Sequence, residues 1–186
     1  MCVGFALRAK GPETVIPVLT KVGNAGIQQL YQSFHKSRFN MLERQGHRLL
    51  QLGIILLLFV CFEGFFIPDL ASPTLGLSVH KLSSLLSVLM LAMGLLWPRL
   101  KLRPAQSHWA FWLLVYSSLI IDFAYVLAAV WGAGNETIRI AGGPYHGTAL
   151  QETIIRILSY SSAPTGIIAF VLILYGLRIK ATEFLK

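Results

Sequence analysis

One histidine, His80, lies about one turn inside a membrane-length apolar stretch of this 186-residue chain. A charged side chain at the centre of a membrane helix costs about 2.5–3.5 kcal/mol on insertion scales, so ionisable residues there usually serve a function. A neutral imidazole at this depth needs a partner, and its ring nitrogens are suited to binding a metal. The position of His80 therefore predicts a binding site inside the membrane.

Serines follow His80 along the same side of the predicted helix. Ser83, Ser84 and Ser87 stand three, four and seven residues after His80, a spacing that places all of them on one helix face. Small residues at this spacing also allow two membrane helices to pack closely. The serines are therefore either part of a site around His80 or a packing surface whose hydroxyls bond to the backbone.

A second polar face is expected in the third apolar stretch. Ser118, Asp122 and Tyr125 are separated by four and three residues, so they share one side of a helix. Asp122 either acts on a ligand beside His80 or holds the bundle together through an ion pair with Arg156 or His80. Tyr125 is either part of the same site or a packed aromatic residue.

Four apolar stretches must position these residues, in a chain that is 55% hydrophobic with a mean hydropathy of +0.64. They run from about 49–66, 75–97, 109–131 and 154–177, and each approaches or reaches the roughly 20 residues that cross a hydrocarbon core about 30 Å thick. The loops between them are short, which makes successive helices antiparallel neighbours. The sequence thus predicts an all-α fold, an integral membrane four-helix bundle.

The basic residues indicate how this bundle is oriented. Lysines and arginines precede the first stretch, fill the second loop and follow the fourth stretch, whereas the first loop has none and the third has only Arg139. Positive charge marks the cytoplasmic side, so both termini are predicted to be cytoplasmic or on an organelle's equivalent side, and the membrane is the cytoplasmic membrane if the source is bacterial. The net charge of +8 is thereby explained by topology and by contact with the lipid bilayer, without nucleic acid as a partner.

The first forty residues differ in composition from the rest. Pro12, Pro17 and several glycines are expected to break any long helix there, and the apolar pattern is weak. We interpret residues 1–40 as an extension, either an artefact of the assigned start or a targeting segment, and residues 41–186 as the four-span membrane domain.

Three blocks of sequence resemble one family. The stretches SPTLGLSVHKLSSLLSVLMLAMGLLWPRLKL, FWLLVYSSLIIDFAYVLAAVWGAG and GGPYHGTALQETIIRILSYSSAPTGIIAFVLILYGLR are similar, in this order, to blocks of the hydroxylaminobenzene mutases, which are related to styrene oxide isomerase. The similarity extends from about Met41 to Arg178 and leaves the extension outside.

The resemblance implies an intramolecular rearrangement of small hydrophobic aromatic compounds. The most direct expectation is a mutase that converts hydroxylaminobenzene to 2-aminophenol, and the alternative is an isomerase that converts an aryl epoxide to an aldehyde. It also implies a homotrimer and a haem b whose iron is bound by His80 and acts as a Lewis acid. Ser83 and Ser84 are then expected beside the cofactor.

One position departs from the family pattern. Related enzymes carry an asparagine about one and a half turns after the histidine, where this chain has Leu86 followed by Ser87. The resemblance therefore makes Asp122, Tyr125 and Ser87 the candidate catalytic residues. An aromatic lining that excludes water is expected from four side chains: Phe65, Phe66, Phe123 and Tyr160.

Two other functional classes compete with the enzyme. A non-enzymatic haem protein usually needs two axial ligands, and His80 is the one histidine within a predicted span. A small transporter subunit would need a proton path through His80, Asp122 and Glu63, but no polar stripe continues through the inner half of the spans. Glu63 lies near a span end, where we expect solvent to reach it.

Overall fold

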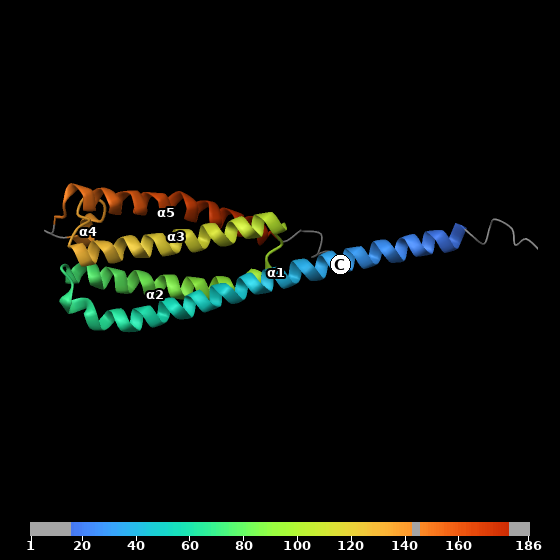
Figure 1. The fold of residues 1–186 in the computed structure, drawn as a ribbon, viewed down its shortest axis with the longest axis horizontal. Coiled ribbons are helices and arrows are strands. Elements are labelled where there is room, and N and C mark those ends of the chain that lie inside the picture. Colours follow the sequence, from blue (N-terminus) through green and yellow to red (C-terminus); the bar gives the residue numbers. More distant parts are fainter. Residues whose placement is uncertain (1–15, 143–145, 179–186) are drawn as a thin grey trace, which may run out of the picture. The chain divides into compact units, whose positions relative to one another are not determined.

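The computed structural model describes residues 16–142 and 146–178, with side chains for residues 40–141 and 146–178. Regular structure in these ranges is helical, without a strand (Figure 1). The elements are α1 (Ile16–Phe66), η2 (Ile67–Asp69), α2 (Pro73–Leu96), η3 (Trp97–Arg99), α3 (Pro104–Trp131), α4 (Arg139–Gly142) and α5 (Ala149–Gly176). The prediction of an all-α fold is confirmed.

Four helical segments in the described residues are long and apolar enough to cross a membrane. They are Asn40–Asp69, Pro73–Arg99, Pro104–Trp131 and Ala149–Gly176. Each contains most or all of one predicted stretch and extends it at one end or both. The four predicted spans are therefore confirmed. Most of the helical segments extend a few residues beyond the limits that the apolar runs predicted.

The chain divides into two compact units, Met1–Asn40 and Met41–Lys186. The prediction that prolines and glycines break any long helix before residue 41 is wrong, because α1 begins at Ile16. Pro17 falls in the first turn of α1, where a helix does not need the missing N–H. A glycine inside a helix costs only about 1 kcal/mol. Pro12 lies outside the described residues, and the two interpretations of the extension stay predictions.

Local signals in the sequence explain where the helices of the larger unit begin and end. The side chain of Ser72 caps α2 by accepting a hydrogen bond from the backbone N–H of Leu75, with Pro73 in the first turn. Thr148 and Gln151 form a capping box at the start of α5. Helix α3 ends at Gly132, whose φ of 62° is in the left-handed region that favours glycine.

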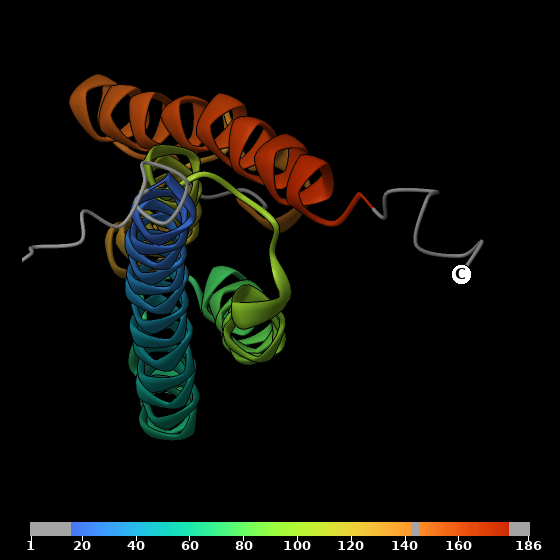
Figure 2. The same ribbon diagram turned by 90° about the vertical axis from the view of Figure 1, so that its right-hand side faces the viewer.

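Helix α3 packs against both α5 and α2 (Figures 1 and 2). Helix α1 packs closely on α2 through glycines. A Cβ added to Gly46 would lie 2.8 Å from the carbonyl oxygen of Gly94, and one added to Gly53 would lie 2.8 Å from the Leu91 side chain. Larger residues at these positions would push the two helices apart.

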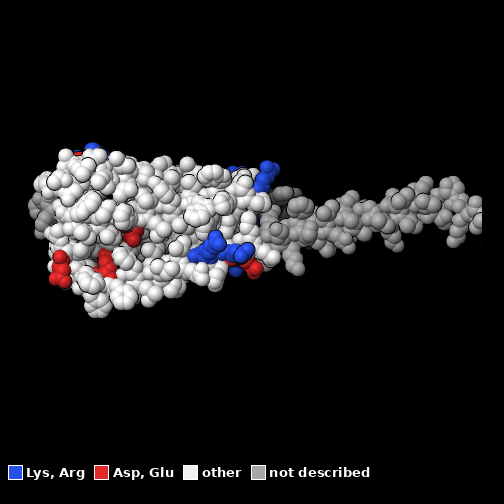
Figure 3. Space-filling model, in the orientation of Figure 1, with Lys and Arg blue, Asp and Glu red and all other residues white. Residues whose placement is uncertain are grey.

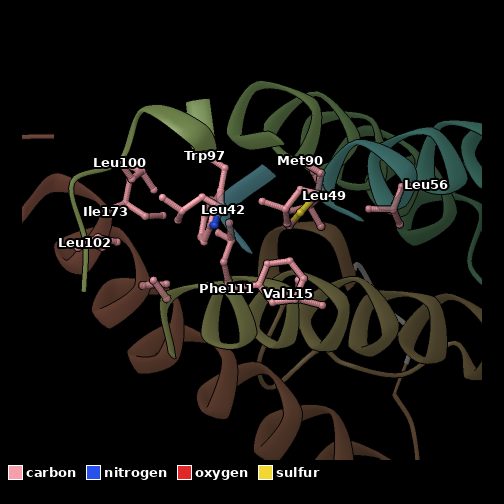
Figure 4. Close-up of a cluster of buried hydrophobic side chains, with 14 residues drawn as sticks. Leu42, Leu49, Leu56, Met90, Trp97, Leu100, Leu102, Phe111, Val115 and Ile173 are labelled. Carbon is pink, nitrogen blue, oxygen red and sulfur yellow. The ribbon is translucent and has the colours of Figure 1, made fainter. Parts of the chain in front are cut away.

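The larger of two apolar clusters fills one end of the bundle, which we call the Trp97 end (Figure 4). Trp97 is fully buried there, and its indole N–H donates to Gln45 Oε1 at 2.9 Å. The hydroxyl of Ser107 donates to the same oxygen at 2.6 Å. This hydrogen-bonded group joins α1, η3 and α3, so the core at this end is both large and internally satisfied.

The opposite end, which we call the α4 end, has a smaller cluster. Its buried members are Leu75, Val79, Ala128, Ala129, Ala133, Ile138 and Ile155. Three alanines among seven residues leave less side-chain volume than the Trp97 end has. His80 and Glu63 lie in this half of the bundle, where α1 ends and α2 begins.

Candidate functional site

His80 lies on the second turn of α2, beside the last turns of α1. A Cβ added to Gly64 of α1 would lie 3.7 Å from Cε1 and 3.9 Å from Nδ1 of the His80 ring. Nδ1 is buried and has no hydrogen-bond partner among the described residues. The imidazole is half-buried as a whole, so the ring stands between the bundle interior and its surface.

The three serines near His80 have different partners. The hydroxyl of Ser83 donates to Asp122 Oδ1 of α3 at 2.5 Å, and both residues are buried. Ser84 instead donates to the carbonyl oxygen of His80, and Ser87 to that of Ser84, both at 2.7 Å. Ser84 and Ser87 thus bond to the backbone of their own helix, and only Ser83 reaches another polar side chain.

Asp122 does not make the ion pair that the sequence analysis left open. Its partner is the Ser83 hydroxyl, whereas Arg156 Nη1 lies 3.3 Å from Glu136 Oε2 in an exposed pair near the α4 end. Among the described residues, Asp122 is thus paired with Ser83 and with neither Arg156 nor His80. Asp122 is a buried carboxylate with one neutral donor, which leaves its other acceptor positions available.

Glu63 is more buried than its position near a span end predicts. We expected solvent to reach it, but both of its carboxyl oxygens are buried, and neither has a hydrogen-bond partner in the described chain. Glu63 lines a groove of about 230 Å³ near the α4 end. The other lining residues are apolar: Phe59, Phe62, Phe66, Leu70, Val79, Val126, Ala129 and Val130.

A second groove, of about 500 Å³, continues from the first along α1 and α3. It is lined by Ile55, Leu56, Phe59, Leu119, Ile120, Asp122, Phe123 and Val126. Phe59 and Val126 line both grooves, which makes the two volumes neighbours. One carboxyl group therefore lies in each part of a long apolar groove between α1 and α3.

The aromatic residues expected around the substrate separate into two groups. Phe66 lines the groove of Glu63 and Phe123 lines that of Asp122. Phe65 and Tyr160 are 79% and 67% exposed and line neither groove. Tyr125 is half-buried, packs beside the smaller apolar cluster and lines neither groove. The structure thus brings Asp122 and Ser83 together but leaves Tyr125 apart from both grooves.

The surroundings of His80 fit a flat metal cofactor better than a bare metal ion. Among the described residues, no group of three or more His, Cys, Asp or Glu side chains is placed to hold an ion. A single imidazole supplies one ligand, so the other ligands of a metal would have to come from a cofactor such as a porphyrin. The buried Nδ1 of His80, which has no partner among the described residues and lies beside Gly64, is consistent with that role.

A buried carboxylate connects the loop after α3 to α5 at the α4 end of the bundle. Glu152 of α5 is 5% exposed and accepts hydrogen bonds from the backbone N–H groups of Gly134, Gly147 and Glu136 at 2.7, 3.3 and 3.4 Å. These bonds tie the segment after α3 to the start of α5. Figure 3 shows most acidic side chains of one face in the α4 half and most basic side chains toward the Trp97 end, where one acidic side chain lies among them.

Comparison with known proteins adds a family and two relatives. The styrene oxide isomerase family model matches residues 45–178. Hydroxylaminobenzene mutase HabB of Ectopseudomonas oleovorans is 40% identical over 133 residues, which cover 72% of this chain and 81% of the relative. Hydroxylaminobenzene mutase HabA of the same organism is 33% identical over 125 residues, covering 67% and 93%. No solved structure matches.

Proposed function

Since the chain belongs to the styrene oxide isomerase family, we propose that it is a membrane-bound isomerase that converts hydroxylaminobenzene to 2-aminophenol. The observation that carries this proposal is the 40% identity to a hydroxylaminobenzene mutase over four-fifths of that enzyme's length. An isomerase that acts on aromatic compounds agrees with the apolar, phenylalanine-lined groove between α1 and α3.

The groove supports the rearrangement through what its own residues do. Its phenylalanine side chains bind the substrate ring and keep water away from it, so that a ring carrying positive charge rearranges instead of adding solvent. The Asp122 carboxylate, held by the hydroxyl of Ser83, orients the polar group of the substrate. We retain Tyr125 and Ser87 as proposed catalytic residues from the family resemblance, although neither lines the grooves.

We propose His80 as the protein ligand of a haem b, with Ser83 and Ser84 beside it. The buried Nδ1 without a partner supports this assignment, because coordination or a bond to a cofactor would remove the cost of an unpaired polar atom. When bound, the haem would supply a Lewis-acidic iron that polarises an oxygen atom of the substrate. His80 directly follows the groove residue Val79 on α2, which supports a cofactor site close to the groove.

We further propose a homotrimer in the cytoplasmic membrane with both termini on the cytoplasmic side. His80 is half-buried at the surface of a single bundle, so a flat cofactor bound there needs a second copy to cover it. The basic side chains gathered toward the Trp97 end support the orientation. Native mass spectrometry that finds a monomer with stoichiometric haem would contradict the trimer.

The test uses the detergent-purified full chain and phenylhydroxylamine in water enriched in oxygen-18. We expect 2-aminophenol without the heavy isotope, because an intramolecular transfer keeps the substrate's own oxygen atom. A Soret band in the same preparation tests the haem separately. Absence of 2-aminophenol would refute the mutase, and incorporation of oxygen-18 would show that water supplies the hydroxyl group.

An aryl epoxide isomerase is the second candidate, and the name of the matching family favours it. The same preparation should then convert styrene oxide to phenylacetaldehyde, and faster than it converts phenylhydroxylamine. We rank this reaction second because both curated relatives are named as hydroxylaminobenzene mutases.

A further inference from the structure

Glu63 and its groove carry an inference about which substrate this enzyme prefers. Both carboxyl oxygens of Glu63 are buried without a hydrogen-bond partner among the described residues, in a groove whose other eight lining residues are apolar. Most buried polar side-chain atoms in proteins have a partner, and an exception requires an explanation. Glu63 therefore either bonds to a molecule that enters the groove or has a structural role in the bundle.

A structural role does not explain Glu63. Within the described part of the chain, it forms no cap and no bond to a neighbouring helix, unlike the buried Asp122 and Glu152, which have bonds from Ser83 and from loop N–H groups. A carboxyl group without a partner in apolar surroundings weakens the fold. Glu63 thus reduces stability without a compensating contact, which is typical of residues retained for function.

The groove has the size and lining for a single aromatic ring. Its volume is about 230 Å³, and Phe59, Phe62 and Phe66 of α1 line it together with residues of α2 and α3. All three phenylalanines are partly exposed at 38%, 64% and 62%, so the groove opens at the surface of the bundle, where an apolar molecule can enter from the lipid. The Glu63 carboxyl group is then the polar contact that a bound aromatic compound meets.

We propose that Glu63 binds the substrate by accepting a hydrogen bond from its N–H or O–H group, and that this contact selects aryl hydroxylamines over aryl epoxides. The inference rests on the proposed function and deepens it. An aryl hydroxylamine carries two hydrogen-bond donors beside its ring, whereas an aryl epoxide carries none. An ionised carboxylate accepts hydrogen bonds and donates none, so the substrate's donor is what distinguishes the two substrates.

The selection has a physical basis in the unpaired group. A substrate with a donor satisfies Glu63 on binding, and one without a donor leaves the carboxyl group buried and unpaired beneath it. Sites built to bond a polar substrate group reject analogues that lack this group far more strongly than apolar sites distinguish substrates by shape. Glu63 is therefore a specificity residue that separates two reactions that occur in one family.

The experiment compares the wild type with Glu63→Met, which keeps the groove filled and removes both acceptors. Calorimetry measures binding of aniline, which has an N–H donor, and of N,N-dimethylaniline, which has none. We expect the wild type to prefer aniline and Glu63→Met to lose this preference. The KM for phenylhydroxylamine should rise at least about tenfold. A tenfold change in binding corresponds to about 1.4 kcal/mol, which is the contribution of about one hydrogen bond.

Two further variants separate binding from folding. Glu63→Gln keeps one acceptor oxygen and should retain part of the preference for aniline. Asp69→Asn removes an exposed carboxylate close by in the sequence, outside the groove, and should behave as the wild type. The thermal midpoint of Glu63→Met should equal or exceed that of the wild type, because the variant no longer buries an unpaired carboxyl group.

Specific results would overturn the inference. An unchanged preference for aniline and an unchanged KM in Glu63→Met would show that Glu63 does not contact the substrate. A lower thermal midpoint, with activity that falls only as the folded fraction falls, would make Glu63 a structural residue. If the wild type prefers aniline but does not rearrange phenylhydroxylamine, the proposed function fails while the binding role of Glu63 stands.

Discussion

The two ends of the bundle differ in whether their buried polar atoms have hydrogen-bond partners. At the Trp97 end, Gln45 accepts bonds from both Trp97 and Ser107, so a buried amide oxygen and two donors are paired. Buried side-chain atoms without a partner in the described residues occur elsewhere, at Glu63, His80, Thr137 and Ser159, all toward the α4 end. Unpaired buried groups lower stability, so the polar atoms of the α4 end stabilise the fold less than those of the Trp97 end.

The two ends also differ in how their apolar residues fill space. The Trp97 end is packed with large side chains such as Trp97, Phe111 and Met90 (Figure 4). The cluster at the α4 end instead contains several alanines and borders the groove of Glu63. Large interlocking side chains stabilise a fold, and grooves cost contact area but admit a ligand. The contrast supports a division in which the Trp97 end maintains the bundle and the α4 end, as we propose, holds the site of the chemistry.

Replacing His80 should have the largest effect on function. We expect His80→Ala to fold and assemble but to bind haem more than about a hundredfold more weakly, because removing a direct ligand costs more than removing its supporting contacts. Mutase activity should be lost with the cofactor. The absorption spectrum and the yield of 2-aminophenol measure the two effects in one preparation.

His108 provides the matched control for that variant. It is an exposed histidine near the start of α3, at the Trp97 end. His108→Ala should keep both the Soret band and turnover. An unchanged spectrum and unchanged turnover in His80→Ala would refute the ligand assignment and place the chemistry elsewhere in the chain.

Asp122→Asn should have the next largest effect. The variant keeps the shape of the side chain and removes its charge, so we expect haem to stay bound and turnover to fall about tenfold to a hundredfold. This range corresponds to the roughly 1.5–3 kcal/mol that a hydrogen bond to a charged group contributes. Turnover per haem and the thermal midpoint are the two measurements.

Ser83→Ala tests whether the bond to Asp122 matters. It removes the hydroxyl that lies 2.5 Å from Asp122 Oδ1, and turnover should fall in the same direction as in Asp122→Asn but by less. Failure of Asp122→Asn to fold, with Ser83→Ala equally unstable, would instead make this pair a structural contact between α2 and α3.

The sequence was sufficient to predict the four spans and the half of the bundle that holds the polar residues. Apolar runs of membrane length identify helices reliably because the lipid requires every backbone group to be paired internally. The helical spacing of Ser83, Ser84 and Ser87 placed them on one face but did not indicate which would reach across to α3. That choice depends on the rotation of α2 about its axis, which the contacts of the whole bundle determine.

Glu63 shows why the groove could not be predicted from the sequence. Its place near a span end suggested contact with solvent, whereas the groove that it lines is completed by residues distant in sequence, among them Val79 of α2 and Ala129 of α3. In the extension, prolines and glycines predict a broken helix, but α1 begins at Ile16 and continues through the glycines. Both errors arise where neighbouring structure overrides a local signal.

At the Trp97 end, a change in a polar residue should affect stability and leave activity intact. Ser107→Ala removes one of the two donors to Gln45 Oε1, which keeps its bond from Trp97. We expect a loss of about 1 kcal/mol in the free energy of unfolding. The thermal midpoint should fall by a few degrees, while turnover per folded protein stays unchanged. A fall in turnover would contradict the division between the two ends.

The smallest effect is expected at Ser84, and it separates the sequence-based expectation from the observed geometry. The resemblance places Ser84 beside the cofactor, but its hydroxyl donates to the carbonyl oxygen of His80 within α2. Such a bond to the preceding turn contributes little to a helix that is already hydrogen-bonded. Ser84→Ala should therefore match the wild type in haem content and turnover, whereas its neighbour Ser83→Ala lowers turnover. Loss of haem in Ser84→Ala would contradict this expectation, because it would show that the cofactor depends on the Ser84 hydroxyl as well as on His80.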